Sequence, residues 1–203
     1  MKSLYVTICI CLMAAIHVMA QTASPDSGRN GENRQAGLNG RVVTDESEAD
    51  ELSLRQQHIV KIASCTGRGD LERLKPALAA GLDDGLTVNE IREVLIHAYA
   101  YCGFPRSMGA LNTFIGVLQE RKARGINDAE GALPTLQEVS RSVEYGAANQ
   151  RKLFGRDAQG AVLAFAPAID QYLKAHLFGD IFGRDNLDWK TRELATIAMP
   201  TAM

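Results

Sequence analysis

The segment over residues 87–107, TVNEIREVLIHAYAYCGFPRS, constrains the fold more than any other part of this 203-residue chain. Thr87 and Glu90 have the spacing of a capping box, so we expect a helix to begin after Thr87. Apolar residues then recur at i, i+4, i+7 and i+11, which predicts one buried face: Ile91, Leu95, Ala98 and Cys102. Gly103 suits the position just past a helix end, and Pro105 suits the first turn of a following helix. The segment therefore predicts two helices that fold sharply against each other.

A second stripe of the same helix carries polar groups that can perform chemistry. Glu93, His97 and Tyr101 lie at i, i+4 and i+8, and Arg106 is expected near the end of this stripe. A neutral His97 can exchange a proton near pH 7, Glu93 can orient it, and Tyr101 can donate to a substrate oxygen. Arg106 can clamp a substrate carboxylate with two hydrogen bonds. The alternatives are structural: a histidine satisfied by Glu93, a packed tyrosine, and an ion pair of Arg106 with Glu93 or Glu90.

Helical patterning begins near residue 52 and continues along the chain, and no segment shows the alternation of a half-buried strand. Further helices are expected over residues 53–67, 70–81, 105–124, 138–153 and 168–182. In the first of these, Ile59, Ile62 and Ala63 should face inward. In the helix over residues 105–124 the expected inward positions are i, i+3, i+7 and i+10: Met108, Leu111, Ile115 and Leu118. The pattern predicts an all-α fold.

The N-terminal part has the composition of an export signal followed by a linker. Lys2 precedes a mostly apolar run that ends in Val18-Met19-Ala20, a small-residue cleavage site, so residues 1–20 are predicted to be a signal peptide, with a retained anchor as the alternative. Residues 21–50 are polar and lack hydrophobic periodicity, which predicts a disordered linker. We therefore expect a periplasmic or secreted protein with no membrane attachment after cleavage.

The charge balance of the chain bears on nucleic-acid binding, and its cysteine content bears on disulfides and metal sites. Removing Lys2 with the signal leaves 21 basic and 24 acidic residues, a balance that gives no reason to expect nucleic acid. Cys65 and Cys102 remain after cleavage and permit one disulfide. The alternative is two separate thiols, with Cys102 on the apolar face and Cys65 more exposed near a helix end. No cluster of Cys and His has metal-ligand spacing, so no metal is expected.

An internal repeat appears near the C-terminal end. Residues 187–198, LDWKTRELATIA, align without a gap with residues 52–63, LSLRQQHIVKIA, at an offset of 187 − 52 = 135. We therefore divide the chain into a complete domain over residues 52–125, connecting helices over 126–177 and the start of a second, truncated copy over 178–203. Because Leu194 and Ile197 need a partner, we expect either a truncated gene or packing of this piece on another subunit.

The motifs around the corner resemble those of the carboxymuconolactone decarboxylase family. They are Gly85-Leu86-Thr87, then Glu90-Ile91-x-Glu93-Val94-Leu95, then Tyr101-x-Gly103-x-Pro105-Arg106. The resemblance covers about residues 52–120, with a stub of a second copy at 178–199. It implies a multi-helical bundle of the alkyl-hydroperoxidase-like type that assembles as homo-oligomers, either trimers or hexamers. One branch of this family decarboxylates a small γ-lactone acid without metal or organic cofactor, and the other reduces peroxides through a Cys-x-x-Cys pair.

This chain departs from the peroxide-reducing pattern because it has no Cys-x-x-Cys. The Glu that the family carries on its first helix is present as Glu193 in the second copy, but His58 stands at the aligned position of the complete copy. His58 is therefore a second acid–base candidate, whereas His176 is expected at the surface. The resemblance implies a cofactor-free decarboxylase or related lyase acting on a small carboxylated lactone-type molecule, with His97, Glu93, Arg106 and Tyr101 as catalytic residues. The alternatives are a peroxiredoxin-type thiol oxidoreductase, disfavoured by the missing cysteine pair, and a non-catalytic truncated family member.

Overall fold

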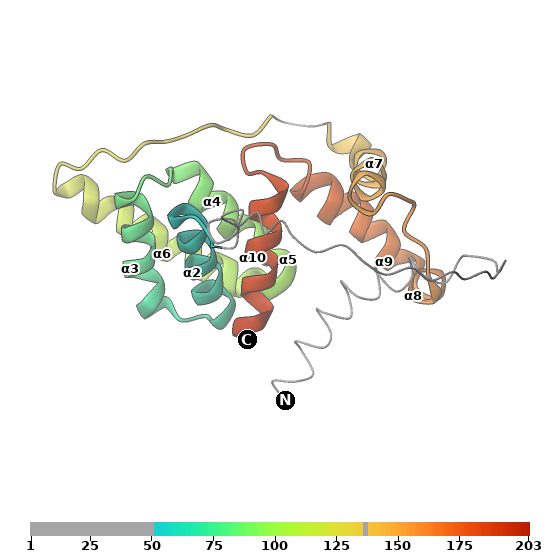
Figure 1. The fold of residues 1–203 in the computed structure, drawn as a ribbon, viewed down its shortest axis with the longest axis horizontal. Coiled ribbons are helices and arrows are strands. Elements are labelled where there is room, and N and C mark those ends of the chain that lie inside the picture. Colours follow the sequence, from blue (N-terminus) through green and yellow to red (C-terminus); the bar gives the residue numbers. More distant parts are fainter. Residues whose placement is uncertain (1–50, 136–137) are drawn as a thin grey trace, which may run out of the picture.

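The computed structural model describes residues 51–135 and 138–203, and every regular element in these ranges is a helix (Figure 1). The elements are α2 (Leu54–Arg68), α3 (Leu71–Asp83), α4 (Val88–His97), α5 (Tyr99–Cys102), α6 (Phe104–Ala123), η1 (Val139–Arg141), α7 (Ser142–Phe154), α8 (Ala161–Phe165), α9 (Pro167–Tyr172), η2 (Leu173–Ile181) and α10 (Trp189–Ala202). The all-α prediction is confirmed. The predicted signal peptide and linker, residues 1–50, lie outside the described ranges. No helix within those ranges is long and apolar enough to cross a membrane.

Local capping chemistry sets the helix starts as predicted. Ser53 and Thr87 each form a capping box, with Gln56 and Glu90 respectively. Gly103, at φ 80°, separates α5 from α6, and this left-handed conformation favours glycine. A proline occupies the first turn of α6, where its missing N–H leaves no bond unmade. The sharp corner between the two helices is therefore present.

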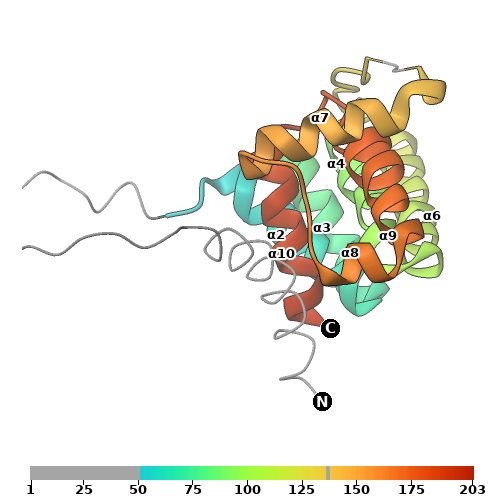
Figure 2. The same cartoon turned by 90° about the vertical axis from the view of Figure 1, so that its right-hand side faces the viewer.

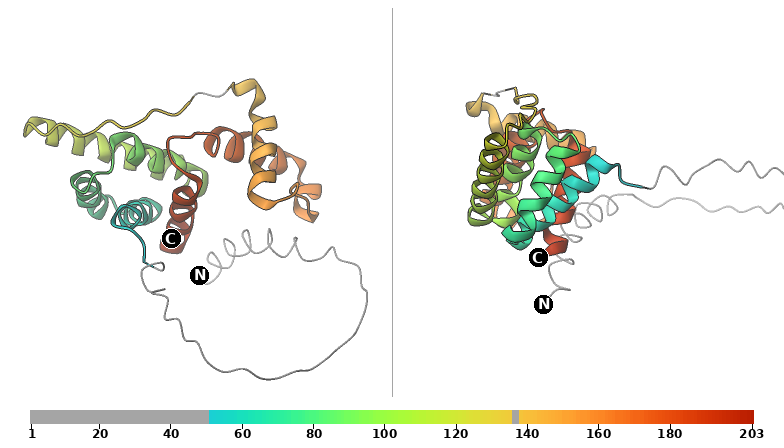
Figure 3. Two further views of the ribbon diagram at one scale, coloured as in Figure 1. Left: turned by 45° about the horizontal axis from the view of Figure 1, so that its top comes forward. Right: turned by 90° about the vertical axis from the view of Figure 1, so that its left-hand side faces the viewer.

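The helices form two groups. Helices α2 to α6 and α10 make one bundle, in which α10 packs against α2 and also contacts α4 and α5 (Figure 1). Helix α7 packs against η2, and α9 leads directly into η2 (Figure 2). Further views show the second group beside the bundle, joined to it through the turn that precedes α10 (Figure 3). The helices expected over residues 138–153 and 168–182 are both present, although η2 is a π-helix and α8 was not expected.

Helix α10 belongs to the same core as the first copy of the repeat. Ala195, Ala198 and Met199 are buried in the apolar cluster formed with α2 to α6, whereas Ile197 is 55% exposed. A Cβ added at Gly67 would lie 2.6 Å from the backbone oxygen of Met199, so glycine permits the close approach of α2 and α10. The repeated helix therefore packs on its own chain, an arrangement that was not among the two expected outcomes.

The predicted inward face of α6 is wrong by one position. Met108 is 64% and Ile115 is 53% exposed, and Leu111 and Leu118 are only partly buried. The buried residues lie one position earlier at each step: Ser107, Ala110, Phe114, Val117 and Arg121. The polar side chains on this buried face have hydrogen-bonding partners outside α6. The hydroxyl of Ser107 donates to the Leu95 carbonyl (2.7 Å), and the guanidinium of Arg121 pairs with Asp83 and Asp128.

Candidate functional site

Glu93 lies at the centre of a buried charge cluster between α4 and the C-terminal part of the chain. Its Oε1 accepts hydrogen bonds from Arg184 Nε at 2.7 Å and from Arg192 Nη2 at 3.0 Å. Glu93 is 1% and Arg192 is 0% exposed, whereas the side chain of Arg184 keeps 29% of its surface in solvent. Two guanidinium groups therefore share one carboxylate, and the three side chains carry a formal surplus of one positive charge.

Arg192 is held by backbone groups as well as by Glu93. Its Nε donates to the Leu187 carbonyl at 3.2 Å, and its Nη2 also donates to the Arg184 carbonyl at 2.7 Å. Burial lowers the pKa of the Arg192 guanidinium from its ordinary value, and the charge of Glu93 opposes that shift. Arg192 Nη1 is buried and has no hydrogen-bond partner in the described part of the chain. The cluster thus retains one buried nitrogen, Arg192 Nη1, that donates to no described acceptor.

His97 lies one turn beyond Glu93 and is fully buried. Its Nε2 is 2.8 Å from Thr196 Oγ1, and its ring contacts the rings of Tyr101 and Phe182 at centroid distances of 5.1 and 5.5 Å. Burial, together with the positive charge of Arg192, lowers the pKa of His97 to about 3. The imidazole is therefore neutral at pH 7. Its Nδ1 is buried without a hydrogen-bond partner among the described residues.

Two polar pairs, one turn apart, join α4 to α10. Glu93 pairs with Arg192, and His97 pairs with Thr196, in both cases across 99 residues. Each helix contributes residues at i and i+4, so two polar stripes face each other. Sequence reasoning found Glu93 and His97 but missed Arg184, Arg192 and Thr196. The repeat offered one clue to the last two residues. At the offset of 135, Arg192 and Thr196 stand where the first copy has Gln57 and Lys61, so the two copies differ at these positions.

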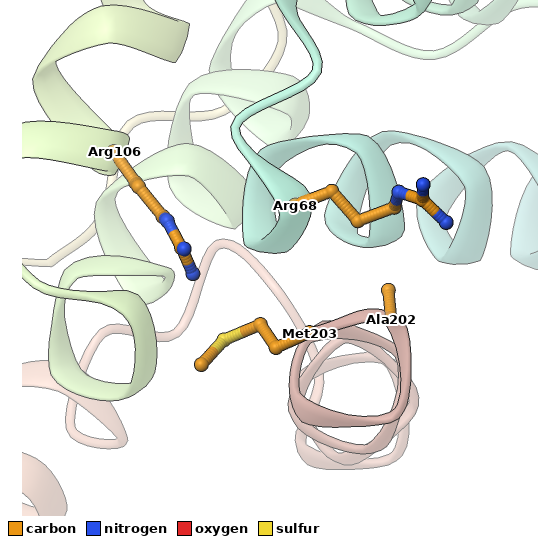
Figure 4. Close-up of a pocket in the computed structure, with 4 residues that line it drawn as sticks. All are labelled: Arg68, Arg106, Ala202 and Met203. Atoms are coloured by element: carbon orange, nitrogen blue, oxygen red, sulfur yellow. The ribbon is translucent and has the colours of Figure 1, made fainter. Parts of the chain in front are cut away.

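Arg106 lies away from this cluster. Its Nη1 donates to the Gly67 carbonyl at 2.5 Å, and so satisfies an acceptor in the last turn of α2. Figure 4 shows its guanidinium in a pocket lined by Arg68, Ala202 and Met203, a set that does not include His97. The alternative ion pair of Arg106 with Glu93 or Glu90 is also not formed within the described ranges. Arg106 therefore does not lie with His97 at the end of the polar stripe, where the sequence predicted it.

The remaining acid–base candidates occupy separate places. Tyr101 is partly buried and lies beside His97, as the stripe predicted. His58 pairs with Asp84 through Nε2 at 2.6 Å, at the loop between α3 and α4. His176 is exposed, as expected, and pairs with Asp180 on η2.

No disulfide joins Cys65 to Cys102. The expected exposures are also wrong, because Cys65 is buried while Cys102 is only partly buried. Cys65 belongs to the apolar core cluster, whose packing covers its thiol. Burial raises the pKa of the Cys65 thiol, with the charge of Asp70 adding to the effect. No group of three or more His, Cys, Asp or Glu side chains in residues 51–135 and 138–203 is placed to hold a metal ion.

The comparison with protein families covers the first part of this fold. Residues 36–114 match the model of the carboxymuconolactone decarboxylase family. A search of curated proteins found no match to the chain. The match supports a carboxymuconolactone decarboxylase-like region, and its described part runs from α2 into α6. Glu93 and His97 lie inside this region, whereas Arg184 and Arg192 lie beyond it.

Proposed function

We propose that this carboxymuconolactone decarboxylase-like protein is a cofactor-free lyase that acts on a small carboxylated lactone-type molecule at the Glu93 cluster. The observation that carries the proposal is a surplus of positive charge at a buried carboxylate: Arg192, which is buried, and Arg184, which is partly exposed, share the single carboxylate of Glu93. Arg192 Nη1 adds an unmet donor within the described ranges. A substrate carboxylate entering beside Arg184 supplies both the missing charge and an acceptor. The carboxylate-binding role expected of Arg106 passes to Arg184 in this proposal.

Decarboxylation requires a group that stabilises the electron pair left on the substrate and a group that delivers a proton. Loss of CO₂ breaks the bond between the carboxylate carbon and the ring carbon, and the electron pair stays on the substrate, delocalised onto the lactone carbonyl oxygen. A guanidinium beside that oxygen stabilises the developing negative charge. The ring carbon then takes a proton, which reaches it from solvent through a proton-transfer group. His97 is the nearest such group, because its ring lies against the same cluster.

Proton transfer through His97 depends on the pKa of its imidazole. With a pKa of about 3 the buried imidazole carries no extra proton at neutral pH. A substrate anion beside it opposes the effect of Arg192 and raises the pKa of His97 toward the range useful for proton transfer. Because His97 is 0% exposed, substrate entry requires movement of the segment that carries Arg184, the partly exposed member of the cluster.

A decarboxylation assay tests the proposal. Purified protein is incubated with γ-carboxymuconolactone, and CO₂ release is compared with a reaction without protein. Replacing Arg184 with Met is expected to lower kcat/KM by at least about tenfold, since the charged contact that binds the substrate carboxylate is lost. Arg141→Met is the matched control, because Arg141 is an exposed arginine that pairs with Glu144. Release no faster than without protein, or equal losses in the two variants, contradicts the proposal.

A non-catalytic role is the second candidate, and one observation favours it. Glu93 and His97 are both fully buried and hydrogen-bonded to α10. In that case the cluster holds the repeated helix on the first copy, and the assay above gives no turnover. We do not propose thiol oxidoreductase activity, because the Cys65 thiol is buried and its pKa is raised.

We also propose that the chain forms a trimer or hexamer after export to the periplasm or the exterior. The exposed apolar side chains of Phe104, Met108 and Ile115 on α6 support self-association. Sedimentation analysis of the secreted protein measures the assembly, and mass spectrometry of its N-terminus tests cleavage after Ala20. Met108→Lys is expected to shift the protein toward monomer, whereas a wild-type monomer contradicts the proposal.

A further inference from the structure

A pocket of about 310 Å³ lies between α7 and the turn that leads into α10, outside the family match. Aromatic rings of Tyr145, Phe182 and Trp189 line it, together with Lys152 and Asp185. Its volume is at the lower end of the range in which proteins bind small molecules. The pocket therefore has room for one small molecule with an apolar, ring-shaped body.

Lys152 is the charge in this pocket that remains available. Its Nζ lies 4.8 Å from the centre of the Trp189 ring, and no described carboxylate forms an ion pair with it. The other charged residue, Asp185, accepts hydrogen bonds from the backbone N–H and the hydroxyl of Thr135 at 2.7 and 2.6 Å. These bonds lower the pKa of Asp185 and direct its oxygens toward Thr135. An anionic group of a ligand is thus expected at Lys152.

One wall of the pocket also borders the Glu93 cluster. The centroid of the Phe182 ring lies 6.1 Å from that of Trp189, which lines the pocket. It lies 5.5 Å from the centroid of the His97 ring, which belongs to the buried cluster. Gly183 and Asp185 line the pocket, while Arg184 between them reaches Glu93 at 2.7 Å. The segment over residues 182–185 therefore separates the pocket from the buried charges.

We propose that this pocket binds a small planar carboxylate, with its ring against the aromatic wall and its carboxylate at Lys152, as the entrance to the Glu93 cluster. The entrance role rests on the proposed function, because only a reacting substrate needs to pass from the pocket to the cluster. The binding itself does not require turnover.

Trp189, the single tryptophan of the chain, provides a signal that reports ligand binding in the pocket. Its indole N–H, which donates to the Phe182 carbonyl at 3.0 Å, gives one signal in a nitrogen-15 spectrum of the full-length protein. Titration with benzoate is expected to shift this signal saturably. Benzyl alcohol, which lacks the charge, and acetate, which lacks the ring, are expected to bind more weakly.

Substitution at Lys152 tests the position of the carboxylate. Lys152→Met is expected to weaken benzoate binding roughly two- to fivefold, the effect of one exposed ion pair, and to leave binding of benzyl alcohol unchanged. Lys190→Met is the matched control, because Lys190 is an exposed neighbour of Trp189 that does not line the pocket. Both lysines are exposed, so neither change is expected to disturb folding.

The outcomes separate this inference from the proposed function. No saturable shift with benzoate, or equal effects of the two lysine substitutions, overturns the inference. Benzoate binding that depends on Lys152 supports the pocket even if the lactone acid is not decarboxylated, in which case only the proposed function fails. Decarboxylation whose KM is unchanged by Lys152→Met supports the proposed function and overturns the entrance role.

Discussion

Replacing Glu93 with Gln is expected to destabilise the protein far more than an ordinary change of charge. The substitution keeps the shape of the side chain but removes the negative charge that faces Arg184 and Arg192. Arg192 is 0% exposed, so its guanidinium cannot turn to water when the carboxylate is lost. Removing one partner of a buried ion pair costs about 3–5 kcal/mol. Because domains of this kind are stable by only about 5–15 kcal/mol, the loss is a large fraction of the total.

Urea unfolding followed by far-ultraviolet circular dichroism measures this loss. Glu120→Gln is the matched control, because Glu120 pairs with Lys75 at the surface, where both side chains are more than half exposed. That control is expected to change the free energy of unfolding by no more than about 1 kcal/mol. The double variant with Glu93→Gln and Arg192→Met removes both buried charges and is expected to recover part of the loss.

Two results would refute this reasoning. If Glu93→Gln costs no more than Glu120→Gln, the carboxylate is not in a buried ion pair. If the effects of Glu93→Gln and Arg192→Met simply add, the two side chains are not coupled, and the register of α4 and α10 described above is wrong.

Three further predictions follow from burial and packing. The folded-state pKa of His97 is about 3 against an ordinary 6.5, so the unfolded state binds the proton more readily. The stability linked to this neutral histidine, on the order of 4–5 kcal/mol in total, is complete above pH 6.5 and is lost as pH falls toward 3. His97→Phe is therefore expected to flatten the dependence of the unfolding free energy on pH, measured by urea unfolding at a series of pH values, and an unchanged dependence would contradict the lowered pKa. Gly67→Ala is expected to cost about 1–3 kcal/mol in urea unfolding, because its Cβ meets the backbone of α10, whereas Gly116→Ala, with no atom within 4 Å, is neutral or stabilising. In a variant with Cys65 as its only cysteine, the thiol is expected to react with Ellman's reagent much more slowly in the folded state than in urea, and equal rates would show that the thiol is not buried.

The predictions that succeeded depend on residues close together in the chain. The capping box at Thr87 and the corner at Gly103 each involve groups within about four positions of one another. The stripe of Glu93 and His97 follows from helical periodicity alone. Such patterns are visible in the sequence because the interacting groups belong to the same turn of helix.

The predictions that failed depend on which helix covers which face. Met108 and Ile115 have the spacing of a buried stripe, but the adjacent face of α6 is the buried one, and its polar members Ser107 and Arg121 find partners outside α6. The exposure of Cys65 was misjudged for a similar reason. Its position at a helix end suggested access to solvent, whereas Cys65 is buried in the apolar core cluster.

By itself the sequence determined the helical class of the chain, the starts and ends of its main helices and the face that carries Glu93 and His97. Only the tertiary structure decided that these two residues meet Arg192 and Thr196, 99 positions further along, and that Arg106 lies elsewhere. The reason is physical: a helix forms from interactions within one or two turns, but burial of its charged groups depends on partners that only the packing of distant helices supplies.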